Sequence, residues 1–139
     1  MSTLMERLDA LARFSDEEGA LTRLYLTPSH RAAAETVRGW MEEAGMTAVI
    51  DAAGSVVGRR EGRTAGLPAL LLGSHIDTVR DAGRYDGNFG VLAAIEAVRR
   101  LHAEGVTLPF AVEVLAFGDE EGVRFPVTLT TARAIAGTF

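Results

Sequence analysis

The sequence predicts an α/β fold in which helices pack on a mixed, largely parallel β-sheet. Two apolar runs, LPALLLG at 67–73 and PFAVEVLAF at 109–117, have the length and composition of buried strands. A helical stripe of apolar residues lies between them and ends at Gly105: Val91, Leu92, Ile95, Val98 and Leu101. The order strand, helix, strand is typical of a βαβ unit, whose two strands pair in parallel.

Two helices are predicted before the first of these strands. Thr3 and Glu6 fit a capping box at the start of an amphipathic helix over residues 3–13. Thr27 and Pro28 are typical of an N-cap followed by the first helical residue, and Gly45 is expected to end this second helix.

The remaining strands are expected to be short. TAVID at 47–51 and SVVGRR at 55–60 favour two strands joined by a tight turn. The run at 67–73 is apolar throughout, so we expect a central strand that is covered on both faces. No internal repeat or low-complexity linker divides the chain, which indicates one domain or a part of one.

Composition excludes several classes of function. The net charge is −5 and the basic residues form no cluster, so neither nucleic acid nor an anionic membrane is an expected partner. The chain has no cysteine, so any metal ion must be held by His, Asp or Glu. The N-terminus lacks a signal-peptide pattern, and no apolar run reaches the ~18 residues of a membrane helix. A cytoplasmic protein is therefore expected.

Two polar clusters follow the two long predicted strands. The first covers residues 74–88 and the second residues 118–124. In open α/β sheets, ligands bind at the carboxyl ends of the strands, so we expect both clusters to share one edge.

The first cluster contains three candidate site residues. His75 and Asp77 are two positions apart, so the carboxylate can accept a hydrogen bond from the ring nitrogen that does not face a metal ion. Taken alone, His75 fits a packing role better. Asp86 taken alone fits an ordinary turn or cap position before a helix.

The second cluster places Asp119, Glu120 and Glu121 directly after a buried strand. Their mutual repulsion at a partly desolvated edge favours a divalent ion as compensating charge, and the alternative is a solvated acidic loop. His75, Asp86 and one glutamate form a ligand set suited to zinc, manganese or cobalt, and the other glutamate can take a proton from an activated water. Considered together, these residues favour a metal site.

A nucleotide site is the natural alternative to a metal site in this part of the sequence. The glycines at 83, 87 and 90 match neither of the common phosphate-binding patterns, which argues against it. The other two histidines, His30 and His102, are expected to be surface residues, the second favourably placed at a helix C-terminus.

The segments GSHIDTV, GRYDG and DEEGVRF resemble signature segments of the zinc-peptidase M20 superfamily. Within it they are similar to the dinuclear-metal amidohydrolase branch, which holds allantoate amidohydrolases, N-carbamoyl-L-amino acid hydrolases (carbamoylases) and β-ureidopropionases. The WMEEAGM helix end and the D-x-x-G segment after it are similar too, so the resemblance covers essentially the whole chain. The spacing of 11 residues from His75 to Asp86 is typical of this branch, whereas M20 peptidases usually have a longer insertion.

The resemblance implies two divalent metal ions, zinc, manganese or cobalt, and a role for each candidate residue. His75 would bind one ion, Glu121 the other, and Asp86 both, while Glu120 would be the general base and Asp77 would steady His75. The implied substrate is a small ureido or amide compound, first allantoate, which releases ammonia and carbon dioxide, or an N-carbamoyl-L-amino acid. A peptidase or deacylase, or a catalytically inactive fragment, is the alternative.

The resemblance also implies that residues 1–139 form the N-terminal part of a catalytic metallohydrolase domain. Family members continue with two more histidine ligands and with a lid domain through which they form homodimers. The chain alone is therefore not expected to turn over substrate. It reads Thr130-Thr131-Ala132-Arg133 where the family usually has a Gly-Ser-Arg segment.

Overall fold

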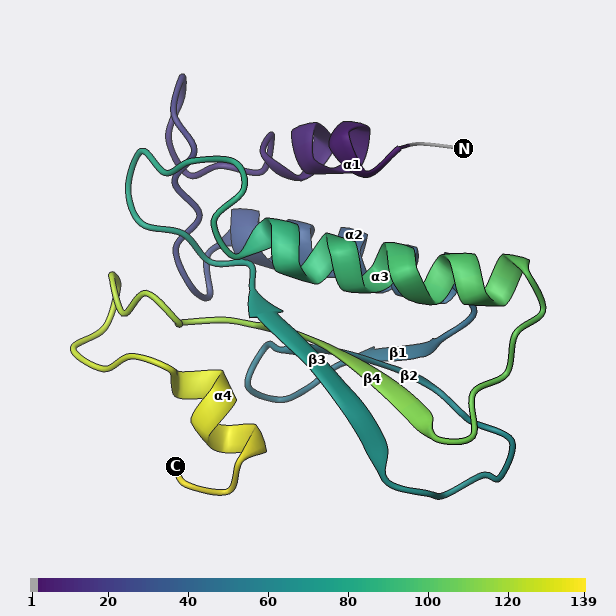
Figure 1. Cartoon of the computed structure of the whole chain (residues 1–139). Coiled ribbons are helices and arrows are strands. Elements are labelled where there is room, and N and C mark those ends of the chain that lie inside the picture. The colour runs from purple at the N-terminus through teal and green to yellow at the C-terminus, as the bar shows by residue number, and fades with distance from the viewer. Residues whose placement is uncertain (1–2) are drawn as a thin grey trace.

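The structure, a computed structural model that describes residues 3–139, has a four-stranded sheet with helices over one face (Figure 1). The elements in chain order are α1 (Leu4–Leu11), α2 (Pro28–Glu43), β1 (Thr47–Ile50), β2 (Val56–Arg60), β3 (Ala69–His75), α3 (Asn88–Ala103), β4 (Ala111–Phe117) and α4 (Thr130–Ile135). Helix α2 contacts strands β1 and β2, and helix α3 contacts strands β3 and β4. Helix α1 packs on α3. In the described part of the chain, no helix combines the length and apolarity that crossing a membrane requires.

Local signals explain where the first two helices begin and end. Thr3 and Glu6 form the predicted capping box of α1, with reciprocal bonds between each side chain and the other residue's backbone N–H. The Thr27 hydroxyl accepts from the backbone N–H of His30 at the start of α2, and Pro28 is its first residue. Gly45, with φ +81°, follows the last turn of α2 in the left-handed conformation that glycine adopts most readily.

The sheet is mixed, as predicted, and its strand order is β1-β2-β4-β3. The predicted hairpin is present, since β1 and β2 pair antiparallel. The expected βαβ unit is present as well, because β3 and β4 pair in parallel across α3. However, β2 and β4 also pair antiparallel. Within residues 3–139, two of the three strand pairings are therefore antiparallel, and the sheet is not largely parallel.

The prediction that β3 is a central strand covered on both faces is wrong for the described residues. It is β4 that lies inside the sheet, between β2 and β3, and β3 forms the edge. Leu70 and Leu71 in β3 are 49% and 54% exposed. An apolar run shows that a strand favours burial but does not show which neighbour will cover it.

The core lies between the sheet and helices α1–α3. Its fully buried members include Leu8 of α1, Met41 of α2, Ile95 of α3 and Val114 of β4. Tight packing of these elements fixes the C-terminal ends of β3 and β4, from which the two polar clusters extend.

Candidate metal centre

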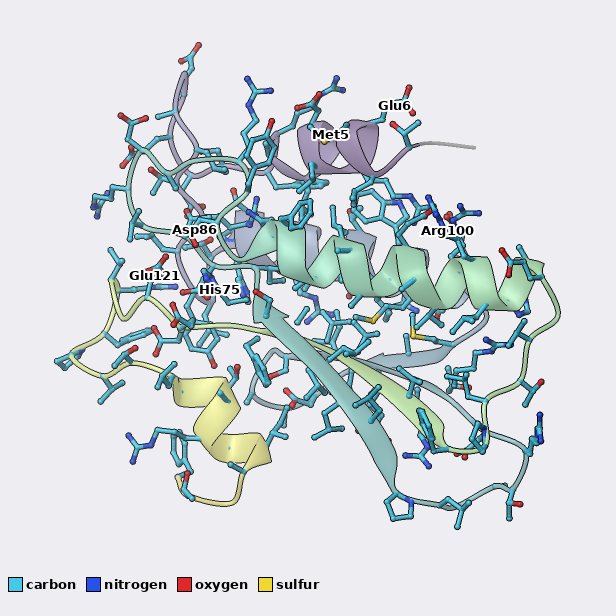
Figure 2. The ribbon with its side chains drawn as sticks, viewed as in Figure 1. Met5, Glu6, His75, Asp86, Arg100 and Glu121 are labelled. Atoms are coloured by element: carbon cyan, nitrogen blue, oxygen red, sulfur yellow. The ribbon has the colours of Figure 1, made fainter. Side chains whose placement is uncertain are left out.

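The parallel pairing of β3 and β4 brings the two polar clusters together. His75, the last residue of β3, is in register with Phe117, the last residue of β4. The chain therefore leaves both strands at the same edge of the sheet. Figure 2 shows His75, Asp86 and Glu121 close together at the tip of β3, as the sequence predicted for these two clusters.

The His75 ring is held with one nitrogen toward the protein and the other toward carboxylates. Its Nδ1 lies 2.9 Å from the backbone oxygen of Asp77. Its Nε2 lies 3.8 Å from the Asp86 carboxylate and 3.7 Å from that of Glu120. If Nδ1–H donates to the Asp77 carbonyl, the lone pair of Nε2 is left free for a metal ion.

Asp77 connects the two clusters. Its carboxylate accepts hydrogen bonds from the backbone N–H groups of Glu120, at 3.1 Å, and Glu121, at 3.2 Å. It lies 3.7 Å from Nδ1 of His75, so the ring contact that we expected from the carboxylate is made by the backbone carbonyl. Burial raises the pKa of the Asp77 carboxyl, and the two backbone N–H groups and His75 partly oppose this shift.

The three consecutive carboxylates point in different directions. Asp119 has φ +58° and is 1% exposed, and one of its carboxylate oxygens accepts from the Thr130 hydroxyl. Glu120 and Glu121 instead face His75, and each of these three residues offers a ligand atom within 4.8 Å of the others. The described residues thus contain a His/Glu group that could hold a metal ion.

The electrostatics of this group favour a cation. Burial raises the pKa of the Glu121 carboxyl, and the neighbouring carboxylates of Asp86, Glu120 and Asp77 raise it further, while His75 opposes them. A divalent ion would relieve this repulsion. An imidazole with several carboxylates is a donor set that zinc, manganese and cobalt accept in proteins, so the residues present fit such an ion.

Residues 71–137 match the protein family described as Peptidase family M20/M25/M40. This range contains all five candidate site residues, His75, Asp77, Asp86, Glu120 and Glu121. Over this segment, the chain is therefore similar to the M20 family.

Curated relatives are similar to nearly the whole chain. Allantoate deiminase 1 of Glycine max is 47% identical over 133 residues, which are 94% of this chain and 28% of the relative. The N-carbamoyl-L-amino acid amidohydrolase of Geobacillus stearothermophilus is 41% identical over 136 residues, 97% of this chain and 33% of the relative. The chain thus spans about a third or less of the length of these relatives.

A solved structure of a hydantoinase/carbamoylase family amidase from Burkholderia ambifaria is similar in fold. It superposes with a TM-score of 0.91 at 35% identity and covers 98% of this chain, which corresponds to 34% of the amidase. The similarity confirms the mixed α/β class of this chain.

Glycine at position 87 allows the site to close around His75, a role that the sequence patterns did not predict. Gly87 precedes α3 with φ +65°, and a Cβ there would lie 2.5 Å from the His75 ring and from its backbone oxygen. The GRYDG segment contained this signal, because a glycine just before a helix often marks a close backbone approach.

Thr131 attaches α4 to the second cluster. Its hydroxyl accepts from the backbone N–H of Gly118 and donates to the Gly118 carbonyl, both at 2.9 Å. This threonine belongs to the Thr-Thr-Ala-Arg segment, where the family usually has Gly-Ser-Arg. A hydroxyl in this segment therefore contacts Gly118, the residue directly before the acidic loop.

His30 is buried, so the prediction that it lies on the surface is wrong. It is 2% exposed and packs edge-on against Tyr25, with ring centroids 5.4 Å apart. Within residues 3–139, its Nε2 has no hydrogen-bond partner. The sequence places His30 in the first turn of a helix but does not show that the preceding loop folds over it. His102 is exposed in the last turn of α3, as predicted.

The buried His30 predicts a pH dependence of stability. Burial, together with repulsion from Arg23, lowers the pKa of the folded-state imidazole to about 4. In the unfolded chain a histidine titrates near ~6.5, so as the pH falls below that value only the unfolded state takes up the proton. The contribution of neutral His30 to the free energy of unfolding should therefore be fully present above pH ~6.5. It should be lost as the pH falls toward ~4, which lowers the free energy of unfolding by about 3 kcal/mol.

Urea denaturation of the protein and of His30→Gln across this pH range measures the effect. The difference between the two unfolding free energies should vary with pH because only the parent carries His30, whereas the carboxyl groups titrate in both proteins and cancel in the difference. His102→Gln serves as the control and should behave like the parent chain. A pH-independent difference between the parent and His30→Gln would contradict the prediction.

Proposed function

We propose that this chain is part of a metal-dependent hydrolase that cleaves carbon–nitrogen bonds in small ureido or amide compounds. The observation that carries the proposal is the convergence of His75, Glu120 and Glu121 at the ends of two parallel strands. The M20 match over these residues supports it.

Each residue has a proposed role that its position supports. His75 and Glu121 would each hold one of two divalent ions, zinc, manganese or cobalt, and Asp86 would contribute to both. When bound, these ions would supply Lewis acidity, which polarises the amide carbonyl and lowers the pKa of water. Glu120 takes a proton from the attacking water and passes it to the leaving nitrogen. Asp77 holds the backbone of both glutamates in place through its carboxylate.

The proposed substrate is allantoate or an N-carbamoyl-L-amino acid. Relatives whose names contain these two compounds are 47% and 41% identical to the chain over most of its length. Peptides and acylated amino acids, the substrate classes implied by the wider family, are the alternative. An assay of the complete protein for ammonia release from allantoate, run beside a dipeptide assay, distinguishes them.

We further propose that residues 1–139 are the N-terminal part of the catalytic domain. Relatives about three times as long or longer support this, since the chain covers 28–33% of the two curated ones described above. The proposed remainder supplies two more histidine ligands and a lid domain through which the protein forms a homodimer. Reading the coding sequence beyond codon 139 tests this proposal. A stop codon directly after Phe139 would favour a non-catalytic metal-binding fragment instead.

Metal binding by the chain itself is the direct test of the site. Calorimetric titration with zinc or manganese should show weak binding, because affinity depends on the number of ligands and on the groups that orient them. We expect Asp86→Asn to weaken this binding by about tenfold or more, because it removes one ligand charge next to His75.

Asp81→Asn is the matched control for this titration. Asp81 lies in the same segment between β3 and α3 and is exposed, so the charge change is identical. Unlike Asp86, however, it does not pair with His75 in the described part of the chain. It should leave the metal affinity nearly unchanged. An equal loss in both variants would show that only the overall charge matters, and the proposed ligand role of Asp86 would then be wrong.

A further inference from the structure

Arg23 is a fully buried cation whose guanidinium bonds three separate segments. It lies in the loop between α1 and α2 and is 0% exposed. Its Nε donates to the backbone oxygen of Ile76 at 2.8 Å, and its Nη2 donates to Oδ1 of Asn88 at 2.8 Å. Its Nη1 donates to the backbone oxygens of Leu11 and Phe14, at 2.8 and 2.9 Å.

The Arg23 backbone adds two bonds to the same strand end. Its N–H donates to the Thr78 hydroxyl at 2.9 Å, and its carbonyl accepts from the Thr78 N–H at 3.0 Å. Arg23 therefore bonds the residues on both sides of Asp77. These bonds hold the segment that carries His75 and Asp77 against the loop.

The bond to Asn88 extends this network to the second segment of the site. Asn88 is the first residue of α3, is 1% exposed, and follows Asp86 by two positions. Its backbone N–H donates to the Asp86 carbonyl at 2.7 Å. One guanidinium thus joins the end of β3 to the start of α3, and both segments carry candidate ligands.

Stability alone does not account for a charge at this position. Desolvation is costly enough to lower the pKa of Arg23 to about 10, although the Asp77 and Asp16 carboxylates oppose that shift. Well-packed apolar side chains often stabilise a core as well as a buried ion does. What arginine offers is a planar fork of five N–H donors in fixed directions, which lysine and apolar residues lack.

We propose that Arg23 is a positioning residue of the metal centre, which sets the placement of His75 and Asp77 relative to Asp86 through the Ile76 carbonyl and Asn88. This inference rests on the proposed function, because it assigns a purpose to the geometry of that site. Among residues 3–139, Arg23 makes no hydrogen bond or ion pair with the side chain of a proposed metal ligand.

The test compares Arg23→Lys and Asn88→Ala with Arg7→Lys. Lysine keeps the positive charge at position 23 but lacks the fork of N–H donors. Asn88→Ala removes one acceptor of that fork and leaves Arg23 in place. The Asn88→Ala variant therefore remains informative if Arg23→Lys does not fold. Arg7 is a buried arginine, 6% exposed, that pairs with Glu43 away from the site, so it controls for the substitution itself.

Two readouts separate positioning from general stability. The first is the affinity for zinc or manganese, which both site variants should weaken by about tenfold or more, as for other groups that orient metal ligands. The second is hydrogen exchange in the metal-free protein. Exchange of the Glu120 and Glu121 amides, which donate to Asp77, should accelerate by about tenfold relative to the amides of β4. Arg7→Lys should change neither the metal affinity nor this ratio.

The possible results distinguish a positioning role of Arg23 from a purely structural one. Uniform acceleration of all amides, or unchanged metal affinity in Asn88→Ala, would show that Arg23 is only structural and would overturn the inference. If the parent chain bound no metal, the proposed function would fail, whereas the exchange ratio would still show whether Arg23 positions Asp77 and the acidic loop.

Discussion

In the proposed complete hydrolase, Glu120→Gln is expected to lower kcat for ureido hydrolysis about 10²- to 10⁴-fold, the usual contribution of a general base, which is the role that we propose for Glu120. Glutamine keeps the size and the hydrogen-bonding capacity of the side chain but cannot take a proton from water. The metal affinity should remain close to that of the parent, because the ligands stay in place. Steady-state kinetics with allantoate, together with metal titration of the same variant, measure both quantities.

The titration also resolves an ambiguity in the geometry. The Glu120 carboxylate lies 3.7 Å from Nε2 of His75, and that of Asp86 lies 3.8 Å from it, so distance alone does not separate base from ligand. Glu121→Gln is the matched comparison, since it is the same change at the next residue and should weaken metal binding. If Glu120→Gln lost the metal and Glu121→Gln kept it, the two roles would have to be exchanged.

Gly87→Ala should destabilise the protein by about 2–5 kcal/mol and abolish metal binding. The new Cβ would lie 2.5 Å from Cε1, Nδ1 and the backbone oxygen of His75, a contact that requires the ring or the strand end to move. The φ of +65° adds strain for any residue with a side chain. Urea denaturation and calorimetric metal titration measure the two effects.

Gly83→Ala is the control in the same segment. Its Cβ would meet nothing within 4 Å, and its φ lies outside the left-handed region. We expect it to be neutral or to stabilise slightly, by up to about 1 kcal/mol, because alanine restricts the unfolded chain. Equal losses in the two variants would mean that the close approach of Gly87 to His75 is not what makes position 87 sensitive.

The sequence predicted those parts of the molecule that depend on local signals. Caps at Thr3 and Thr27, and the stop at Gly45, fixed the helix limits closely. The juxtaposition of His75 with Glu120 and Glu121 also followed from the sequence, because a strand–helix–strand pattern implies parallel strands that end at the same edge.

Features that depend on distant contacts could not be predicted in this way. The apolar run of β3 is compatible with a central or an edge position, and only the pairing in the sheet decides between them. The burial of Arg23 and His30 depends on the loop before α2, which has no periodic pattern. Asp119 resembles its two acidic neighbours in sequence, but a positive φ turns it inward toward Thr130.

The parallel pairing of β3 with β4 also has a consequence for the order of folding. The two strands are separated by the whole of α3, so their pairing must close a long loop, which makes it a slow step compared with helix formation. The same pairing brings His75 to the acidic residues after β4. We therefore expect affinity for divalent ions to emerge late during refolding, together with the completed sheet rather than with the first helices.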